Sequence, residues 1–441
     1  MTGGTEKALL DEDGMATRPS AVGALRRDLG GRSSRFTLMA FDQALLSALM
    51  FSLNLALIHW GTKADYAGFA IVMSAALLSQ SIQNAAICVP LMVLGRRWEP
   101  REFPGFEAHL RRVNLAGALI SAVVCGAVAL LAPGGDSRPA EGLAAATGLA
   151  VLGVWFREYR RTSQLREGRL GALAASDAIV AALVVSGLWY LVKRQGGLSA
   201  LEVLAVLGAA NLLVSMRGTL PVARSAAVSQ HVLRDWSTQI RMSTTGSAVT
   251  WLQATSYPIL VAAVVGTRAA ADVAAARLFL SPGLLLGTAW GRLGMLRATE
   301  AIRDGGWARW RRFVTEQTVR VGFVTVAYIV VVVVAVAFGV GRILGDEYGN
   351  KSLIWCWLLV GFFTMIRTVA SIALQGAAAF GELLRWGGVS ALVSCAAVLA
   401  LARLWGATGC VVGVAAGELV NCMAFFYVVR RLNKDTSSGR K

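Results

Sequence analysis

Apolar stretches of membrane length are the feature that most limits how this chain can fold. We predict about twelve helical spans, each near the ~20 residues needed to cross a hydrocarbon core. In chain order they cover residues 37–60, 66–94, 113–132, 143–156, 171–192, 200–220, 244–265, 273–296, 313–338, 353–375, 383–405 and 407–429. Backbone groups find no water inside a bilayer, so such segments fold as helices. The predicted fold class is therefore all-α and polytopic.

The composition leaves few residues for a soluble domain outside the membrane. Of the 441 residues, 56% are apolar and 16% are charged, and the mean hydropathy is +0.58. The six cysteines lie in or beside apolar segments, and none forms a CxxC pair or a metal-ligand spacing. We interpret them as packing residues and expect neither a metal site nor a disulfide.

The basic residues predict how the chain is oriented. The net charge is +17, which in a soluble protein would suggest a nucleic-acid partner. Here most Lys and Arg residues lie in alternate loops, so no nucleic acid is expected. The other loops hold only Lys63, Arg138, Lys193, Arg194, Arg268, Arg342, Lys351 and Arg403. By the positive-inside rule the basic side is cytoplasmic, which places both termini in the cytoplasm.

A longer polar connector divides the spans into two groups of six. We predict a flexible leader at 1–36 and lobes at 37–220 and 244–429. A cytoplasmic connector covers 221–243, and a cytoplasmic tail covers 430–441. An even number of spans in each group gives the two lobes the same orientation, as in parallel internal repeats.

Short motifs in both halves resemble one family of bacterial transporters. In the first half they are Phe41-Asp42-Gln43-Ala44-Leu45-Leu46, Asn54, Trp60-Gly61, Tyr66-Ala67-Gly68-Phe69, Gln80-Ser81-Ile82-Gln83-Asn84 and Val89-Pro90-Leu91. In the second half they are Leu344-Gly345-Asp346-Glu347-Tyr348 and Trp405-Gly406-Ala407-Thr408-Gly409-Cys410. The pattern resembles Wzx-type polysaccharide flippases of the multidrug/oligosaccharidyl-lipid/polysaccharide (MOP) exporter superfamily.

The resemblance implies two six-helix lobes around a central cleft, lined largely by spans one, two, seven and eight. It also implies a bacterial inner-membrane protein that moves undecaprenyl-diphosphate-linked oligosaccharides for exopolysaccharide, capsule or O-antigen synthesis. Its partners would be the lipid-linked oligosaccharide, membrane lipids, a glycan polymerase and a chain-length regulator. Transport needs no covalent chemistry, so we expect no catalytic residue and no cofactor beyond a coupling proton or sodium ion.

Arg367 and Glu418 lie near the middle of spans ten and twelve. A charge at that depth costs at least ~2.5–3.5 kcal/mol, so both should face protein or water. Two interpretations stay open. They form a buried structural ion pair, or Arg367 faces the cleft and binds a diphosphate through its planar donor fork.

Three further charges lie within spans. Arg277, one turn into span eight, is a candidate substrate contact, and the alternative is snorkelling to headgroups. Asp42, at the start of span one, is a candidate coupling or gate residue, and the alternative is a helix N-terminal acid favoured by the helix dipole. Asp177, early in span five, is also a candidate coupling or gate residue, and the alternative is a buried structural role. Asp42 and Arg277 enter from opposite faces, so we expect no direct salt bridge between them.

A polar patch lies on span two. Gln80, Gln83 and Asn84 follow the i, i+3, i+4 spacing of one helix face. Amides there can hydrogen-bond sugar hydroxyls, and we predict that the patch lines the cleft. The alternative is that these amides bridge neighbouring helices.

Two other function classes compete with the flippase. A cation-coupled exporter of small molecules should favour acidic and aromatic residues in its cavity. A membrane glycan polymerase or ligase should show a sizeable outer loop, and every predicted outer loop is short. The only histidines are His59, His109 and His231, and they suggest no Ser/His/Asp or metal constellation.

Overall fold

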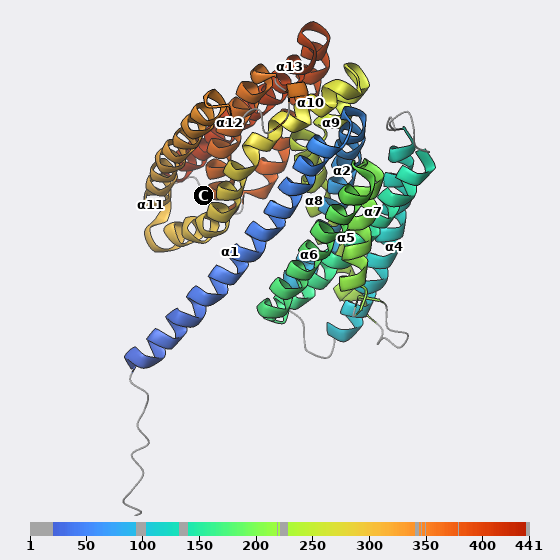
Figure 1. Ribbon diagram of the computed structural model, residues 1–441. Helices are drawn as coiled ribbons and strands as arrows, with labels where there is room; N and C mark the ends of the chain where they lie inside the picture. Colours follow the sequence, from blue (N-terminus) through green and yellow to red (C-terminus); the bar gives the residue numbers. More distant parts are fainter. Residues whose placement is uncertain are drawn as a thin grey trace, which may run out of the picture.

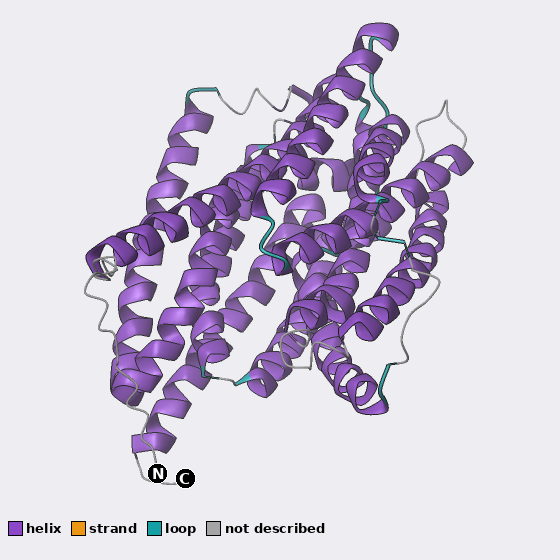
Figure 2. Cartoon of the chain, turned by 90° about the horizontal axis from the view of Figure 1, so that it is seen from below, coloured by secondary structure: helices purple, strands orange, loops and turns teal. Residues whose placement is uncertain are grey.

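The computed structural model describes residues 21–93, 103–131, 140–217, 219–220, 228–339, 344, 346–348, 350–377 and 379–437, and the described part contains helices and loops but no strand (Figure 2). The helices are α1 (Ala21–Trp60), α2 (Lys63–Gln83), α3 (Val89–Val93), α4 (Phe103–Leu131), α5 (Ala140–Arg166), α6 (Leu170–Gln195), α7 (Ala200–Ser215), α8 (Gln230–Ala254), α9 (Tyr257–Val264), α10 (Thr267–Arg277), α11 (Ser281–Ala337), α12 (Lys351–Gly376) and α13 (Phe380–Ser437). Short turns η1 (Asn84–Cys88), η3 (Leu278–Leu280) and η5 (Asp346–Tyr348) complete the order.

Two of these helices are hairpins. Gly306 in α11 has φ 62° and ψ −163°, and Gly406 in α13 has φ 57° and ψ −135°. Glycine adopts positive φ without the steric cost that a Cβ brings, so the chain reverses at both points. We call the two parts of α11 its first arm (residues 281–305) and its second arm (residues 307–337).

The helices account for the predicted spans. By length and apolarity, seven helices of the described part can cross a membrane, or eight if α8 and α9, bent by 49°, form one span. One of those seven is the α13 hairpin, which supplies two spans. Helix α7 is short at 16 residues, and α5 ends in polar turns. With them the chain has roughly twelve membrane helices, which confirms the all-α polytopic fold.

The helices gather into two lobes with a cleft between them. In Figure 1, α4 to α7 stand on one side and α11 to α13 on the other, while α1 and α2 lie between. The first lobe has a core around Phe106, Trp155 and Tyr159. The second packs Trp310 against Ala373 and Phe425. We call the helix ends that carry the arginine-rich loops the basic end, and the other the opposite end.

Helices extend beyond the predicted apolar limits at the basic end. Helix α1 begins at Ala21, so it covers residues 21–36 of the predicted leader. Helix α5 continues to Arg166, α8 takes up residues 230–243 of the predicted connector, and α13 continues to Ser437. Hydropathy marks only the part of a helix inside hydrocarbon, and polar turns can continue that helix in water.

Two further boundaries follow from the structure. Spans ten and eleven are separated at residues 377–379, between α12 and α13. Residues 1–20, 221–227 and 438–441, which the sequence assigns to leader, connector and tail, lie outside the described residues.

Candidate functional site: a central cleft between the lobes

Three cavities join into one cleft between the lobes. The C chamber, about 850 Å³, is lined by α2, α8, α12 and α13. The N chamber, about 490 Å³, is lined mainly by α1, α2 and α5. The deep chamber, about 190 Å³, lies among α1, α2, α9 and α10. Asn84 borders both large chambers, Thr255 borders the C and deep chambers, and Met50 borders the N and deep chambers.

The cleft reaches the basic end and is closed at the opposite end. The C chamber includes Gln375 and Phe380, which flank the α12–α13 turn. At the opposite end, Lys63 of α2 makes a 2.8 Å ion pair with Asp272 of α10. The Lys63 ammonium also donates to the Glu347 carbonyl oxygen at 2.7 Å and lies over the Tyr348 ring. One side chain thus ties the first lobe to the second on that side.

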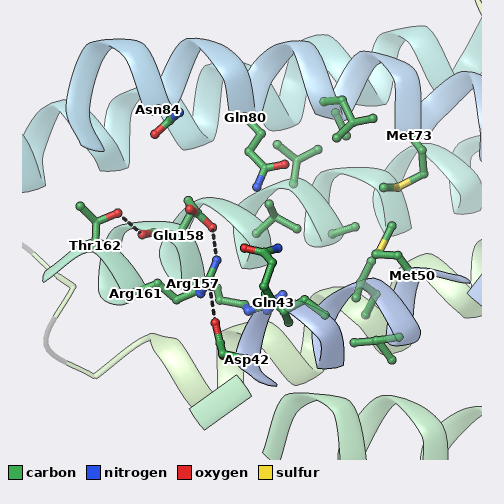
Figure 3. Close-up of a pocket in the computed structure, with 18 of the residues that line it drawn as sticks. Asp42, Gln43, Met50, Met73, Gln80, Asn84, Arg157, Glu158, Arg161 and Thr162 are labelled. Carbon is green, nitrogen blue, oxygen red and sulfur yellow. Dashed lines mark hydrogen bonds and ion pairs between the residues drawn. The ribbon is translucent and has the colours of Figure 1, made fainter. Parts of the chain in front are cut away.

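Arg161 joins the two acidic candidates of the first lobe. Its Nη2 lies 2.7 Å from Asp42 Oδ2, and its Nε lies 2.8 Å from Asp177 Oδ2. Arg157 Nε donates to Asp177 Oδ1 at 2.8 Å. Asp42 and Asp177 are 3% and 1% exposed. Figure 3 shows the guanidinium of Arg161 between Asp42 on α1 and Glu158 on α5.

In this cluster, arginine side chains balance the charge of the carboxylates. Burying two carboxylates is costly unless opposite charges accompany them, and here two guanidinium groups supply that charge. Arg161 therefore lies between Asp42 and Asp177 and supplies positive charge to both. Asp42 Oδ1 and Arg157 Nη2 are buried without a hydrogen-bond partner among the described residues, so both keep capacity for one further polar contact.

The three amides of the span-two patch lie in two different environments. Gln80 and Asn84 line the N chamber, and Gln80 points toward Gln43 across it (Figure 3). Gln83 does not line the cleft, contrary to our prediction. It is fully buried and donates to Asn114 Oδ1 at 2.9 Å and to the Trp155 carbonyl at 2.7 Å. Positions 83 and 84 differ by about 100° around a helix, so one face cannot hold all three amides equally, and Gln83 bridges α2 to α4 and α5.

The second lobe places its own arginine beside a buried acid. Arg367 Nε lies 2.7 Å from Glu418 Oε2, and Glu418 is 2% exposed. Gln253 of α8 donates to Glu418 Oε1 at 3.1 Å and accepts from Asn421 Nδ2 at 3.0 Å. The structure thus places both residues of the proposed ion pair together, and both line the C chamber. The geometry serves either a structural pair or a substrate contact.

We expect Arg367→Ala to destabilise the protein, because it leaves the Glu418 carboxylate buried with only an amide donor. Removing one partner of a buried pair typically costs ~3–5 kcal/mol. Adding Glu418→Ala should restore part of the lost thermal stability, measured by fluorescence-detected size-exclusion chromatography after heating. A double variant as unstable as Arg367→Ala, with Glu418→Ala alone harmless, would argue against the pairing.

Arg277 lies at the deep chamber without an acidic partner. Its guanidinium stands over the Tyr257 ring at 5.0 Å and the Trp357 ring at 5.5 Å. It is half-buried and borders the chamber. Among the described residues it makes no ion pair or hydrogen bond. Aromatic faces stabilise a cation but leave its N–H donors unused, so this arginine can take up an anion.

Several site residues could have been found in the sequence only with better helix limits. Arg157 and Arg161 share one face of α5 by i, i+4 spacing, and Glu158 lies three residues before Arg161. Because span four was expected to end at Phe156, both arginines were assigned to the basic loop that follows it. Lys63 and Asp272 meet across the lobes, and no local pattern in the sequence signals that contact.

Comparisons with known proteins agree on the fold. The chain is similar to an inward-facing multidrug resistance MATE family transporter of the MOP superfamily, with a TM-score of 0.72, 12% identity, and coverage of 90% of this chain and 96% of that one. An outward-facing MATE transporter gives 0.62 at 13% identity, covering 92% and 96%. Lipid II flippase MurJ in an inward closed conformation gives 0.65 at 12%, covering 90% and 87%. No protein-family profile and no curated protein matches the chain.

Proposed function

We propose that this protein is a flippase that moves a diphosphate-linked oligosaccharide across the membrane on an undecaprenyl carrier. The observation that carries the proposal is Arg277, an arginine without an anionic partner among the described residues. It borders the deep chamber, at the closed end of the central cleft. A guanidinium presents planar, bidentate donors that match phosphate oxygens. A diphosphate entering the cleft would supply the charge that Arg277 lacks.

The rest of the cleft suits a glycan. Hydroxyl and amide groups line the C chamber, among them Ser247, Thr250, Ser371, Gln375 and Asn84. Such groups donate and accept hydrogen bonds, as sugar hydroxyls require. The carrier's apolar tail can remain in lipid, so only the diphosphate and the sugars need the cleft.

Topology and the fold fit this role. By the positive-inside rule the arginine-rich loops favour a cytoplasmic location for the basic end, and the cleft opens toward that end. The substrate would therefore enter from the inner leaflet of a bacterial inner membrane. A glycan polymerase and a chain-length regulator, acting on surface polysaccharide, would use the product on the other side.

The cation-coupled exporter of small molecules is the second candidate, because the fold is shared with multidrug transporters. A cationic drug needs a free carboxylate in the cleft. Asp42, Asp177 and Glu418 each pair with an arginine at 2.7–2.8 Å. The charge arrangement therefore favours an anionic substrate over a cationic one.

Arg277→Ala should impair export of the surface polysaccharide while the protein remains in the membrane. Loss of one charge-assisted contact to phosphate costs about 1.5–3 kcal/mol, equivalent to a roughly ten- to hundredfold slower step. Surface polymer and lipid-linked oligosaccharide pools are measured at equal protein abundance.

The matched control is Arg403→Ala, which removes an exposed arginine at the opposite end and should leave export unchanged. Arg277→Lys keeps the charge but not the planar fork, so we expect an intermediate defect. Normal polymer levels in Arg277→Ala would remove this residue from the mechanism.

A further inference from the structure

A second elongated cavity lies within the second lobe. It has a volume of about 320 Å³ and runs between the two arms of α11 and helix α12. We call it the α11–α12 groove. It shares no lining residue with the central cleft. Ser281 and Leu284 line the deep chamber, whereas Leu280, Gly283 and Gly287 line the groove.

The body of the groove is apolar and its floor is sealed. Leu280, Val321, Ile329, Leu358 and Met365 form much of its wall. Close helix packing closes the floor. A Cβ on Gly287 would lie 2.7 Å from Met365 Sδ, and one on Gly361 would overlap the Leu280 side chain. The α11–α12 groove therefore has no route to the cleft through these contacts.

The mouth of the groove faces the membrane. Val324 lines it and is 52% exposed, and its neighbour Phe323 on the second arm is 77% exposed. Large apolar side chains with that exposure are expected where a helix contacts lipid tails. A hydrocarbon chain can thus enter from the side.

The basic end of the groove is polar and positively charged. Arg297 on the first arm and Arg320 on the second border it, with Gln317 between them. Gln317 is 6% exposed and accepts from Trp290 Nε1 at 3.1 Å. In the described part of the chain Arg297 has no ion pair, and Arg320 has only a 3.9 Å contact with Glu316. Two arginines therefore converge on one end of an apolar groove with little anionic compensation.

Among the described residues, the first lobe has no such opening where its own helices cross. Trp155 of α5 packs against Gly117 of α4 and donates to Ser79 Oγ of α2 at 2.6 Å. At Gly322, on the second arm of α11, a Cβ would meet Ile366 Cδ1 at 3.4 Å and no other atom of the described side chains.

We propose that the α11–α12 groove binds one anionic phospholipid of the leaflet at the basic end. One acyl chain lies in the apolar body, and the phosphate sits between Arg297 and Arg320. Anionic headgroups are attracted to basic residues at this surface. The site is separate from the central cleft and does not depend on the identity of the transported substrate.

Native mass spectrometry of the purified protein, with phosphatidylglycerol and phosphatidylcholine of identical acyl chains, tests the proposal. We expect one phosphatidylglycerol per chain to be retained in preference to phosphatidylcholine, by about thirtyfold for two arginines. Arg297→Ala/Arg320→Ala should abolish that preference. Arg311→Ala/Arg312→Ala removes the same charge from exposed positions of the second arm and should keep it.

A second pair of variants tests the apolar body. Val324→Trp places an indole at the mouth and should lower retention of both lipids, whereas Val319→Trp, on the same arm but outside the groove, should not. Equal phosphatidylglycerol retention in wild type and Arg297→Ala/Arg320→Ala would overturn the proposal. So would a groove that retains a polyprenyl diphosphate in place of phosphatidylglycerol when both are offered.

Discussion

Arg161→Ala is expected to cause the largest loss of stability of any single charge removal in this protein. Arg161 makes the ion pair with Asp42, and it also contacts Asp177 and Glu158. Removing one partner from a buried ionic cluster costs ~3–5 kcal/mol. Asp177 keeps Arg157 at 2.8 Å, so the penalty falls mainly on Asp42. The thermal midpoint in detergent, followed by size-exclusion chromatography, measures the loss.

Two further variants separate charge from size at this position. Arg161→Lys has one ammonium and cannot span both carboxylates, so we expect partial stability. Asp42→Asn/Arg161→Gln/Asp177→Asn removes charges of both signs and should be more stable than Arg161→Ala alone. Arg169→Ala removes a 65% exposed arginine and should change stability by no more than about 0.5 kcal/mol. If Arg161→Ala behaves like Arg169→Ala, the cluster does not hold α1 to α5 and α6.

Lys63→Glu is expected to open the cleft at the opposite end. It replaces the 2.8 Å ion pair with Asp272 by repulsion between two carboxylates, and it removes the contact with Tyr348. The pair is about one quarter exposed on both sides, so solvent screens part of its strength. A change of about 1–2 kcal/mol shifts the ratio of two states by roughly 5–30-fold. The distance between spin labels at Gln195 and Arg403, one in each lobe, measures the shift.

Exchanging the charges of Lys63 and Asp272 supplies the control for Lys63→Glu. Lys63→Glu/Asp272→Lys restores opposite charges across the lobes and should return most of the short distance. Lys193→Glu, at the exposed end of α6, reverses one charge on the same side without a cross-lobe partner and should leave the distance unchanged. A distance distribution that Lys63→Glu does not alter would mean that other contacts keep this end closed.

The membrane fold could be predicted because hydropathy reports directly on it. Twelve apolar stretches gave the helices, and Gly306 and Gly406 mark reversals inside what are otherwise continuous helical segments. The helix limits at the basic end could not be predicted in the same way, since polar turns such as residues 157–166 of α5 continue a helix without an apolar signal. For that reason Arg157 and Arg161 were not predicted as site residues.

The direction in which each side chain points was the second feature that could not be predicted from the sequence. The sequence placed Asp42, Asp177, Arg367 and Glu418 at membrane depth, where partners are expected, but it did not indicate that Arg161 joins the first two. Gln83 and Asn84 are adjacent, and a small rotation decides that Asn84 reaches the cleft while Gln83 is buried against Trp155. Contacts between distant segments, such as Lys63 with Asp272, depend on how the lobes meet and leave no trace in local spacing.

The central claim concerns which face of the membrane holds the lipid-linked oligosaccharide. The most direct measurement extracts undecaprenyl-linked oligosaccharides from a strain that lacks this protein and probes which leaflet contains them. Our account predicts that complete repeat units accumulate on the cytoplasmic face and that surface polymer is lost. Unchanged lipid-linked pools, or complete units already facing outward, would contradict it.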